Sequence, residues 1–497
     1  MKVSTKISNS TFSNLVRYSA WNFIALILPL LVGLVTIPYL LQQIGIERFG
    51  VLTIMWAIIG YFSLFDFGIS KALTKKLAEG RANEDLQIQR KVFWTAIQLM
   101  LGLGILGWLV LMLLLLGLDN VLIKVSADIK DEVDKANLLI AFSIPLVVVS
   151  AGLRGSLEAY EKFRASNILR LILGVWMFLA PAIGSGLGYT SLTQMALILI
   201  VGRGIAAIAS WFMVAHAMSG LGRPLFAKEL VIPLFSFGVW ITISGVVGPL
   251  MVYLDRFLVG AFVGAVAVAY YATPQDVATK LIFIPIAINA ALLPIISKEL
   301  AVTANERASL EGLLIKSIWL GLICIAPFCA AMLMFSNELL TLWLGKNFAD
   351  QGSVVAQLFG VGILINAVGT VLVSYLYASG QPSRVAKLHL AELPLYLIVL
   401  YPALIKFGFV GAACVWVLRV LVDTTFLWHF TLNILPKMCC HTLKLLGVIA
   451  VFLVFVVISA QFNSLTSKLW LFMISCLLPG LLAYWYFYHK PLKVYTT

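Results

Sequence analysis

Long apolar runs separated by short polar loops make up most of the sequence. A membrane-spanning helix needs about 20 mainly apolar residues, and runs of this length recur from one end of the chain to the other. The pattern predicts about fourteen spanning helices, near residues 18–41, 49–69, 93–117, 137–153, 167–186, 191–214, 231–254, 272–297, 313–336, 354–378, 386–405, 409–431, 443–461 and 468–488. We therefore expect an all-α polytopic membrane protein.

The composition supports this fold class and excludes others. Of the 497 residues, 61% are hydrophobic and 11% are charged, whereas soluble chains have about 45–50% apolar and about 25% charged residues. No long hydrophilic insertion and no GxxxxGK[ST] phosphate loop is present, which argues against a nucleotide-binding domain. The six cysteines lack metal-ligand and disulfide-framework spacing. We expect no cofactor, no metal site and no enzymatic activity.

The distribution of positive charge predicts the orientation of the chain in the membrane. The net charge is +13, and in an apolar chain the excess of Lys and Arg in cytoplasmic loops explains such a balance more simply than nucleic-acid binding. With the predicted spans, 24 of the 35 Lys and Arg residues fall on one side, which includes both termini. Both termini are therefore expected in the cytoplasm.

The two halves of the chain resemble each other at a shift near 217 residues. The segment VGRGIAAIASWF aligns with VLRVLVDTTFLW, so that Arg203 falls over Arg419. Six spans separate the copies, which predicts a parallel repeat about an axis along the membrane normal. The expected organisation is a six-helix bundle over residues 1–225, a second over 226–434, and two additional C-terminal helices over 435–497.

Arg203 and Arg419 are the basic residues placed deepest in predicted spans. A charge at mid-helix costs at least about 2.5–3.5 kcal/mol, and guanidinium groups bind phosphate oxygens in bidentate fashion. One interpretation is a cationic cavity between the bundles for a phosphate-bearing substrate. The alternative is structural, since Asp423 lies one helical turn after Arg419 and could pair with it.

Other charged residues within spans are candidates for ion coupling or cavity lining. Glu392 follows His389 by three residues, and such a pair on one helix face could exchange protons; the alternative is an interfacial Glu held by a loop Lys. Asp276 and Lys280 are four residues apart, which allows either a functional role or mutual neutralisation. Asp423 is a further possible coupling carboxylate.

Two prolines occupy corresponding spans of the repeat. Pro29 lies in the first predicted span and Pro249 in the seventh. Interrupted helices beside a midplane site are common in secondary transporters. These prolines are therefore candidate hinges for alternating access, or else simply packing features of membrane helices.

With these features, the chain resembles the multidrug/oligosaccharidyl-lipid/polysaccharide (MOP) exporter superfamily, and within it the Wzx-type polysaccharide flippases. The resemblance is carried by the N-terminal VRYSAWNFIALILPLLVGLVTIPYLLQQIGIERFGVLTIMWAIIGYFSLFDFGISKALTKKLAEG, by LDRFLVGAFVGAVAVAYY in mid-chain, and by the number of spans. It implies a MATE-like, V-shaped pair of bundles in the bacterial inner membrane. It also implies movement of an undecaprenyl-pyrophosphate-linked oligosaccharide, such as an O-antigen repeat unit, driven by an ion gradient.

The resemblance leaves other functions open. A cation-coupled multidrug antiporter would need Glu392, Asp276 and Asp423 unpaired in the cavity, and a lipid II flippase would share the fold and the anionic cargo. A membrane scaffold for glycan assembly would not depend on Arg203. The implied partners are the lipid-linked oligosaccharide, membrane lipid and a polysaccharide polymerase or ligase; no nucleic acid is expected.

Overall fold

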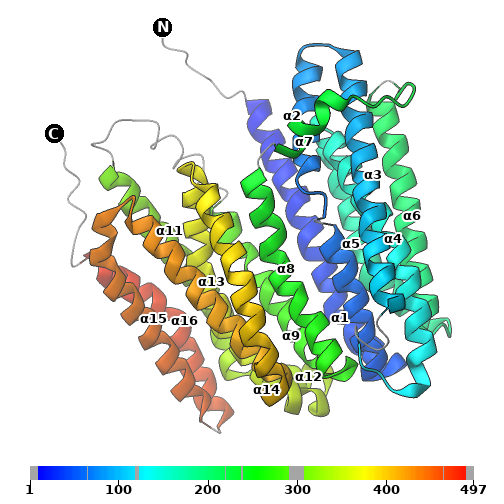
Figure 1. Ribbon diagram of the computed structural model, residues 1–497. Helices are drawn as coiled ribbons and strands as arrows, with labels where there is room; N and C mark the ends of the chain where they lie inside the picture. The colour runs from blue at the N-terminus through cyan, green and yellow to red at the C-terminus, as the bar shows by residue number, and fades with distance from the viewer. Residues whose placement is uncertain are drawn as a thin grey trace. The chain divides into compact units, whose positions relative to one another are not determined.

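The computed structural model describes residues 9–63, 65–117, 123–218, 220–236, 239–289, 307–462 and 464–488, and within these ranges every regular element is helical (Figure 1). The chain divides into two compact units, Met1–Ala269 and Tyr270–Thr497. The first holds α1 (Asn9–Phe62), α2 (Ile69–Ala82), α3 (Leu86–Gly117), α4 (Ala127–Ala159), α5 (Phe163–Gly186), α6 (Leu192–Ala217), α7 (Val231–Ser236) and α8 (Val239–Phe262). The unit boundary falls within α9 (Ala265–Leu281). The second unit holds α11 (Arg307–Met334), α12 (Ser336–Leu344), α13 (Lys346–Ala378), α14 (Pro382–Leu432), α15 (Cys439–Ala460) and α16 (Leu465–Tyr488).

Ten helices in the described ranges are long and apolar enough to cross a membrane. Large apolar side chains also cover their outward faces; Leu116 of α3 is 75% exposed and Ile398 of α14 is 69% exposed. Such exposure is costly in water, at about 25 cal/mol per Å² of apolar surface, and is the expected state of a side chain facing lipid. The expectation of an all-α, multi-pass membrane protein is confirmed.

Helix α14 folds back on itself at Gly408. The 51 residues of this element contain one residue with non-helical angles, Gly408, at φ 59° and ψ −144°. Nε2 of His389 lies 3.4 Å from Oδ1 of Asp423, although 34 residues of straight helix would separate them by about 51 Å. The two arms of α14 are therefore antiparallel neighbours. The reversal falls in the gap 406–408 between two predicted spans.

Helix α1 contains a second reversal of the same kind. Its non-helical residue is Gly45, at φ 77° and ψ 165°, within the gap 42–48 between the first two predicted spans. Phe178 of α5 meets both arms: its ring lies 4.9 Å from that of Trp56, centroid to centroid, and a Cβ at Gly33 would lie 3.4 Å from it. In one straight helix, residues 33 and 56 would be about 35 Å apart.

Glycine is required at these two reversals for conformational reasons. A Cβ at Gly45 or at Gly408 would meet nothing within 4 Å, so space does not demand the glycine. The positive φ does, because L residues with a side chain adopt these angles only at a cost of about 1–3 kcal/mol.

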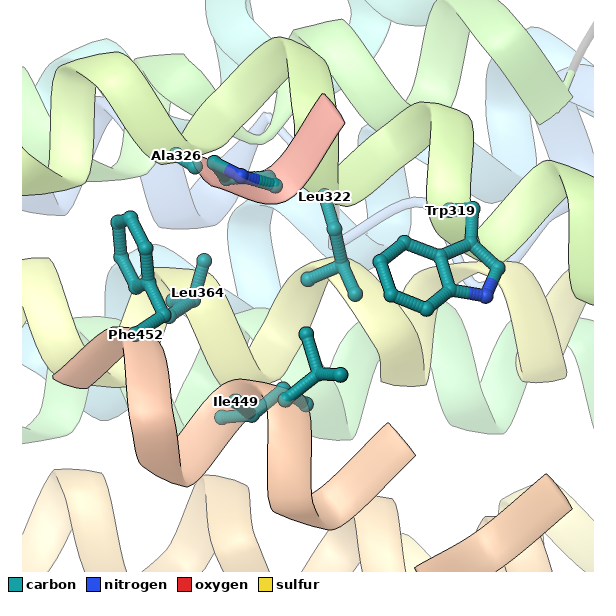
Figure 2. Close-up of a pocket in the computed structure, with 8 residues that line it drawn as sticks. Trp319, Leu322, Ala326, Leu364, Ile449 and Phe452 are labelled. Atoms are coloured by element: carbon teal, nitrogen blue, oxygen red, sulfur yellow. The ribbon is translucent and has the colours of Figure 1, made fainter. Parts of the chain in front are cut away.

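Helices α15 and α16 pack against α11 in the second unit. A small apolar pocket lies at this junction, lined by Trp319 of α11, Leu364 of α13, Phe452 of α15 and Pro479 of α16, among others (Figure 2). The two C-terminal helices therefore continue the apolar core of this unit through side-chain packing.

Candidate functional site

The reversal of α14 brings four ionisable side chains of the second unit together. His389 and Glu392 lie on the first arm, and Arg419 and Asp423 lie on the second. Nε2 of His389 lies 3.4 Å from Oδ1 of Asp423, and the charges of Asp423 and Arg419 both act on Glu392. We call these four residues the α14 cluster. It joins two pairs that the sequence predicts separately.

Helical spacing explains which side chains meet. Residues three, four and seven apart share a helix face, so His389, Glu392 and Tyr396 lie along one face of the first arm, and Arg419 and Asp423 along one face of the second. The guanidinium carbon of Arg419 lies 6.0 Å from the centroid of the Tyr396 ring, within cation–π range. This contact extends the packing between the two arms by one turn.

The carboxylates of the α14 cluster are buried. Glu392 is 5% exposed and Asp423 is 9% exposed. Neither oxygen of Glu392 has a hydrogen-bond partner within the described residues, and Oδ1 of Asp423 has only the contact with His389. A buried carboxylate without compensating donors is strongly disfavoured in its charged form. Ionising the buried carboxylates of the cluster is therefore unfavourable, and a bound cation would reduce this free-energy cost.

Arg203 occupies a different environment in the first unit. It lies in α6 with 11 residues of the helix before it and 14 after it, about 17 Å from the start of the helix. The residue is half-buried, and the charge that acts on it is a second guanidinium, Arg154 of α4. Within the described part of the chain, no carboxylate forms an ion pair with Arg203. Such a site favours an anionic ligand.

The sequence interpretation did not identify Arg154. The predicted span 137–153 ends one residue before it, so Arg154 counted as a loop residue; in the structure α4 continues to Ala159. Glu158 and Asp66 also act on the charge of Arg154, as does Arg170 of α5. Only the packing of α4 on α6 relates Arg154 to Arg203, and hydropathy carries no signal of that packing.

Asp276 and Lys280 lie in α9. Asp276 is half-buried and Lys280 is exposed, and Nζ of Lys280 lies 5.7 Å from the centroid of the Phe283 ring. A role for this pair in ion coupling stays a prediction.

The two candidate hinge prolines lie inside continuous helix. Pro29 of α1 packs closely on α5, since a Cβ at Gly174 would lie 2.6 Å from its Cγ. Pro249 of α8 is half-buried. Both helices continue through these prolines, so a hinge role for either residue also stays a prediction.

Comparisons with known proteins identify the family. Residues 15–299 match the family described as "Polysaccharide biosynthesis protein", and residues 241–402 match the MatE family. A Shigella flexneri protein named as a candidate O-antigen transporter is 31% identical over 421 residues, which is 84% of this chain and 98% of that protein. A Haloferax volcanii protein named as a probable flippase of low-salt glycan biosynthesis is 25% identical over 428 residues, 84% of this chain and 83% of that protein.

Solved structures support the same fold. The lipid II flippase MurJ in an inward closed conformation has a TM-score of 0.69 at 15% identity, over 95% of this chain and 99% of that chain. An inward-facing MATE-family transporter of the MOP superfamily has a TM-score of 0.67 at 13% identity, over 84% and 99% of the two chains. The Shigella flexneri and Haloferax volcanii relatives are named as a transporter and a flippase, which confirms the expectation that the protein is not an enzyme. The chain belongs to the polysaccharide biosynthesis protein family and is a Wzx-type flippase of the MOP superfamily.

Proposed function

We propose that this protein moves an undecaprenyl-pyrophosphate-linked oligosaccharide, an O-antigen or other surface polysaccharide repeat unit, across the bacterial inner membrane. The observation that carries the proposal is the position of Arg203 at mid-helix beside Arg154, with no ion-paired carboxylate in the described residues. A guanidinium at this depth beside a second one is costly unless a ligand neutralises its charge. A pyrophosphate supplies that charge together with several acceptor oxygens.

The proposed architecture is the one expected from the sequence. Ten candidate spans are described, and the reversals in α1 and α14 divide two of them. Adding α8 and α9 brings the proposed total to about fourteen. The division at residues 225/226 and 434/435, the cytoplasmic termini and a polymerase or ligase partner are parts of the same proposal.

The proposed transport cycle is alternating access driven by an ion gradient. Arg203 holds the pyrophosphate, and Arg419 is the second predicted substrate ligand. The two arginines have opposite surroundings, however, because Arg203 lies beside a cation and Arg419 lies in the α14 cluster with two carboxylates. This difference predicts that removal of Arg203 impairs substrate binding more directly than removal of Arg419.

Export of surface polysaccharide tests the proposal. Cells that lack the native protein would carry Arg203→Ala, Arg203→Lys or Arg419→Ala at equal protein level. The matched control is Arg223→Ala, which removes an exposed arginine of the same unit. We expect loss of export in Arg203→Ala, partial export in Arg203→Lys because the charge remains, and normal export in the control. Normal export in both alanine variants would contradict the proposal.

The same variants separate the main alternative. A lipid II flippase shares this fold, as the MurJ comparison illustrates. Loss of a cell's lipid II flippase would stop cell-wall synthesis. If the wild-type protein restores growth to cells depleted of their own lipid II flippase but restores no surface polysaccharide, the substrate is lipid II.

A further inference from the structure

The α14 cluster contains a buried carboxylate pair that the pyrophosphate site does not use. We propose that Glu392 and Asp423 together bind one proton, that His389 delivers it, and that this proton is the coupling ion of transport. The coupling role rests on the proposed flippase function. Proton binding itself is a property of the isolated protein and is testable without substrate.

The charge balance of the cluster gives the number of protons. With both carboxylates ionised, Arg419 charged and His389 neutral, the α14 cluster carries one net negative charge. Glu392 is 5% and Asp423 is 9% exposed, and a net charge at such sites is disfavoured. The negative charge of Asp423 also opposes ionisation of Glu392, because two like charges that interact do not both form readily. One proton makes the group neutral.

Other titratable groups lie on α14 and on the helices that pack against it. The arms of α14 also carry Tyr396, which lies against Arg419, and a set of exposed side chains: Arg384, Lys387, Tyr401, Lys406, Cys414 and His429. Helix α13 packs on α14 and meets the second arm beside Asp423 through Gly369, where an added Cβ would lie 2.9 Å from Oγ1 of Thr424. The titratable residues of α13 and of the short helix after α14, Pro436–Met438, are Lys346, Asp350, Tyr375, Tyr377 and Lys437. The nearest of those in α13, Tyr375, lies about 9 Å along the helix from Gly369.

The neighbouring groups favour a proton over a metal cation. A metal ion of the hard type needs six or more oxygen ligands, whereas the cluster places a guanidinium and an imidazole beside the two carboxylates. A guanidinium offers only donors and carries a positive charge, so it repels a second cation. A proton needs one carboxylate oxygen, and both oxygens of Glu392 are available within the described residues.

His389 connects the carboxylates to the edge of the site. Its side chain is 13% exposed, and its Nε2 lies 3.4 Å from Oδ1 of Asp423. An imidazole can accept a proton on one nitrogen and release one from the other. The proton passes from His389 to Asp423, and is then shared between Asp423 and Glu392. No bond other than N–H and O–H is made or broken.

Infrared difference spectroscopy on the purified full-length protein tests proton binding. Spectra at a series of pH values follow the C=O stretch of protonated carboxyl groups in wild type, Glu392→Gln, Asp423→Asn, His389→Gln and the control Asp350→Asn, which removes an exposed carboxylate of α13. We expect a carboxyl band in wild type that persists well above the pH at which exposed carboxylates ionise. It should be lost in Glu392→Gln and in Asp423→Asn, and be retained in the control and in His389→Gln.

Two further measurements complete the test. Proton uptake after a pH jump should be slowed at least tenfold in His389→Gln, although the band remains. Replacing choline chloride with sodium chloride should leave the titration unchanged. A band that persists in Glu392→Gln, or a midpoint that moves with sodium, would overturn the proposal. If the bands behave as expected but Arg203→Ala exports normally, the proton site stands and the proposed substrate role of Arg203 fails.

Discussion

Gly411 sets how closely the two arms of α14 approach each other, and Gly411→Ala should push them apart. A Cβ at this position would overlap the backbone carbonyl oxygen of Ala403 and would lie 2.9 Å from Cβ of Phe407. Neither neighbour can rotate away, because one is a backbone atom and the other a Cβ. The arms must therefore shift, and overpacking of this kind costs about 1–3 kcal/mol.

Substitutions at two other glycines serve as comparisons for this prediction. Gly408→Ala leaves the space free but places a side chain at φ 59°, which costs about 1–3 kcal/mol through the backbone. Gly447 in α15 has open space around it and no positive φ. Gly447→Ala should therefore be neutral or stabilise the helix by about 0.5–1 kcal/mol.

The assay is reversible unfolding in mixed detergent micelles, with the infrared carboxyl band recorded on the same samples. Gly411→Ala and Gly408→Ala should both unfold at lower denaturing-detergent fraction than wild type. In Gly411→Ala the 3.4 Å contact between His389 and Asp423 should also open, which weakens the carboxyl band. A Gly411→Ala protein as stable as Gly447→Ala, with an unchanged band, would refute the inference that this close approach builds the cluster.

Two further predictions concern ion pairs outside the cluster. Glu132 accepts hydrogen bonds from Nε and Nη2 of Arg48, both at 3.2 Å, and from the backbone N–H of Leu192 at the start of α6. Glu132→Ala should therefore lower the free energy of unfolding by about 1–3 kcal/mol. A decrease no larger than that of the control Lys135→Ala, which breaks an exposed ion pair, would contradict this prediction. Burial alone would raise the pKa of Glu338, but its hydrogen bond from Lys468 and the charge of that lysine bring the pKa below its usual value. Because the folded pKa is the lower one, the pair stabilises the fold above about pH 4.3, and this contribution is lost as the pH falls through the folded value. Glu338→Gln should thus melt below wild type at pH 7 and approach it in acid, and a pH-independent difference would argue against the ion pair.

The sequence predicted the helical, membrane-spanning character because the hydropathy of a segment indicates whether lipid or water surrounds it. It also placed the breaks at Gly45 and Gly408 within the gaps between predicted spans. The contact of Glu132 with Arg48 was not predicted, because α4 begins at Ala127, ten residues before the span expected at 137. That first part of α4 is polar, and a helix that extends beyond the membrane has no hydropathy signal.

Helical periodicity predicts which residues of the α14 cluster share a helix face, but it does not predict how the two faces pair. Spacing along one helix indicated that His389 and Glu392 share a face, and that Arg419 and Asp423 share another. It did not relate the two faces, because they meet only if the arms pair about a fixed point. In the structure, Glu392 and Asp423 lie 16 and 15 residues from Gly408, and Tyr396 and Arg419 lie 12 and 11 residues from it. Residues nearly equidistant from a helical reversal are level with each other, so the positive φ of one glycine fixes which charges meet. A glycine between two apolar runs is therefore worth testing as a point of helix reversal, because residues at equal distances before and after it can meet in one site although helical periodicity does not relate them.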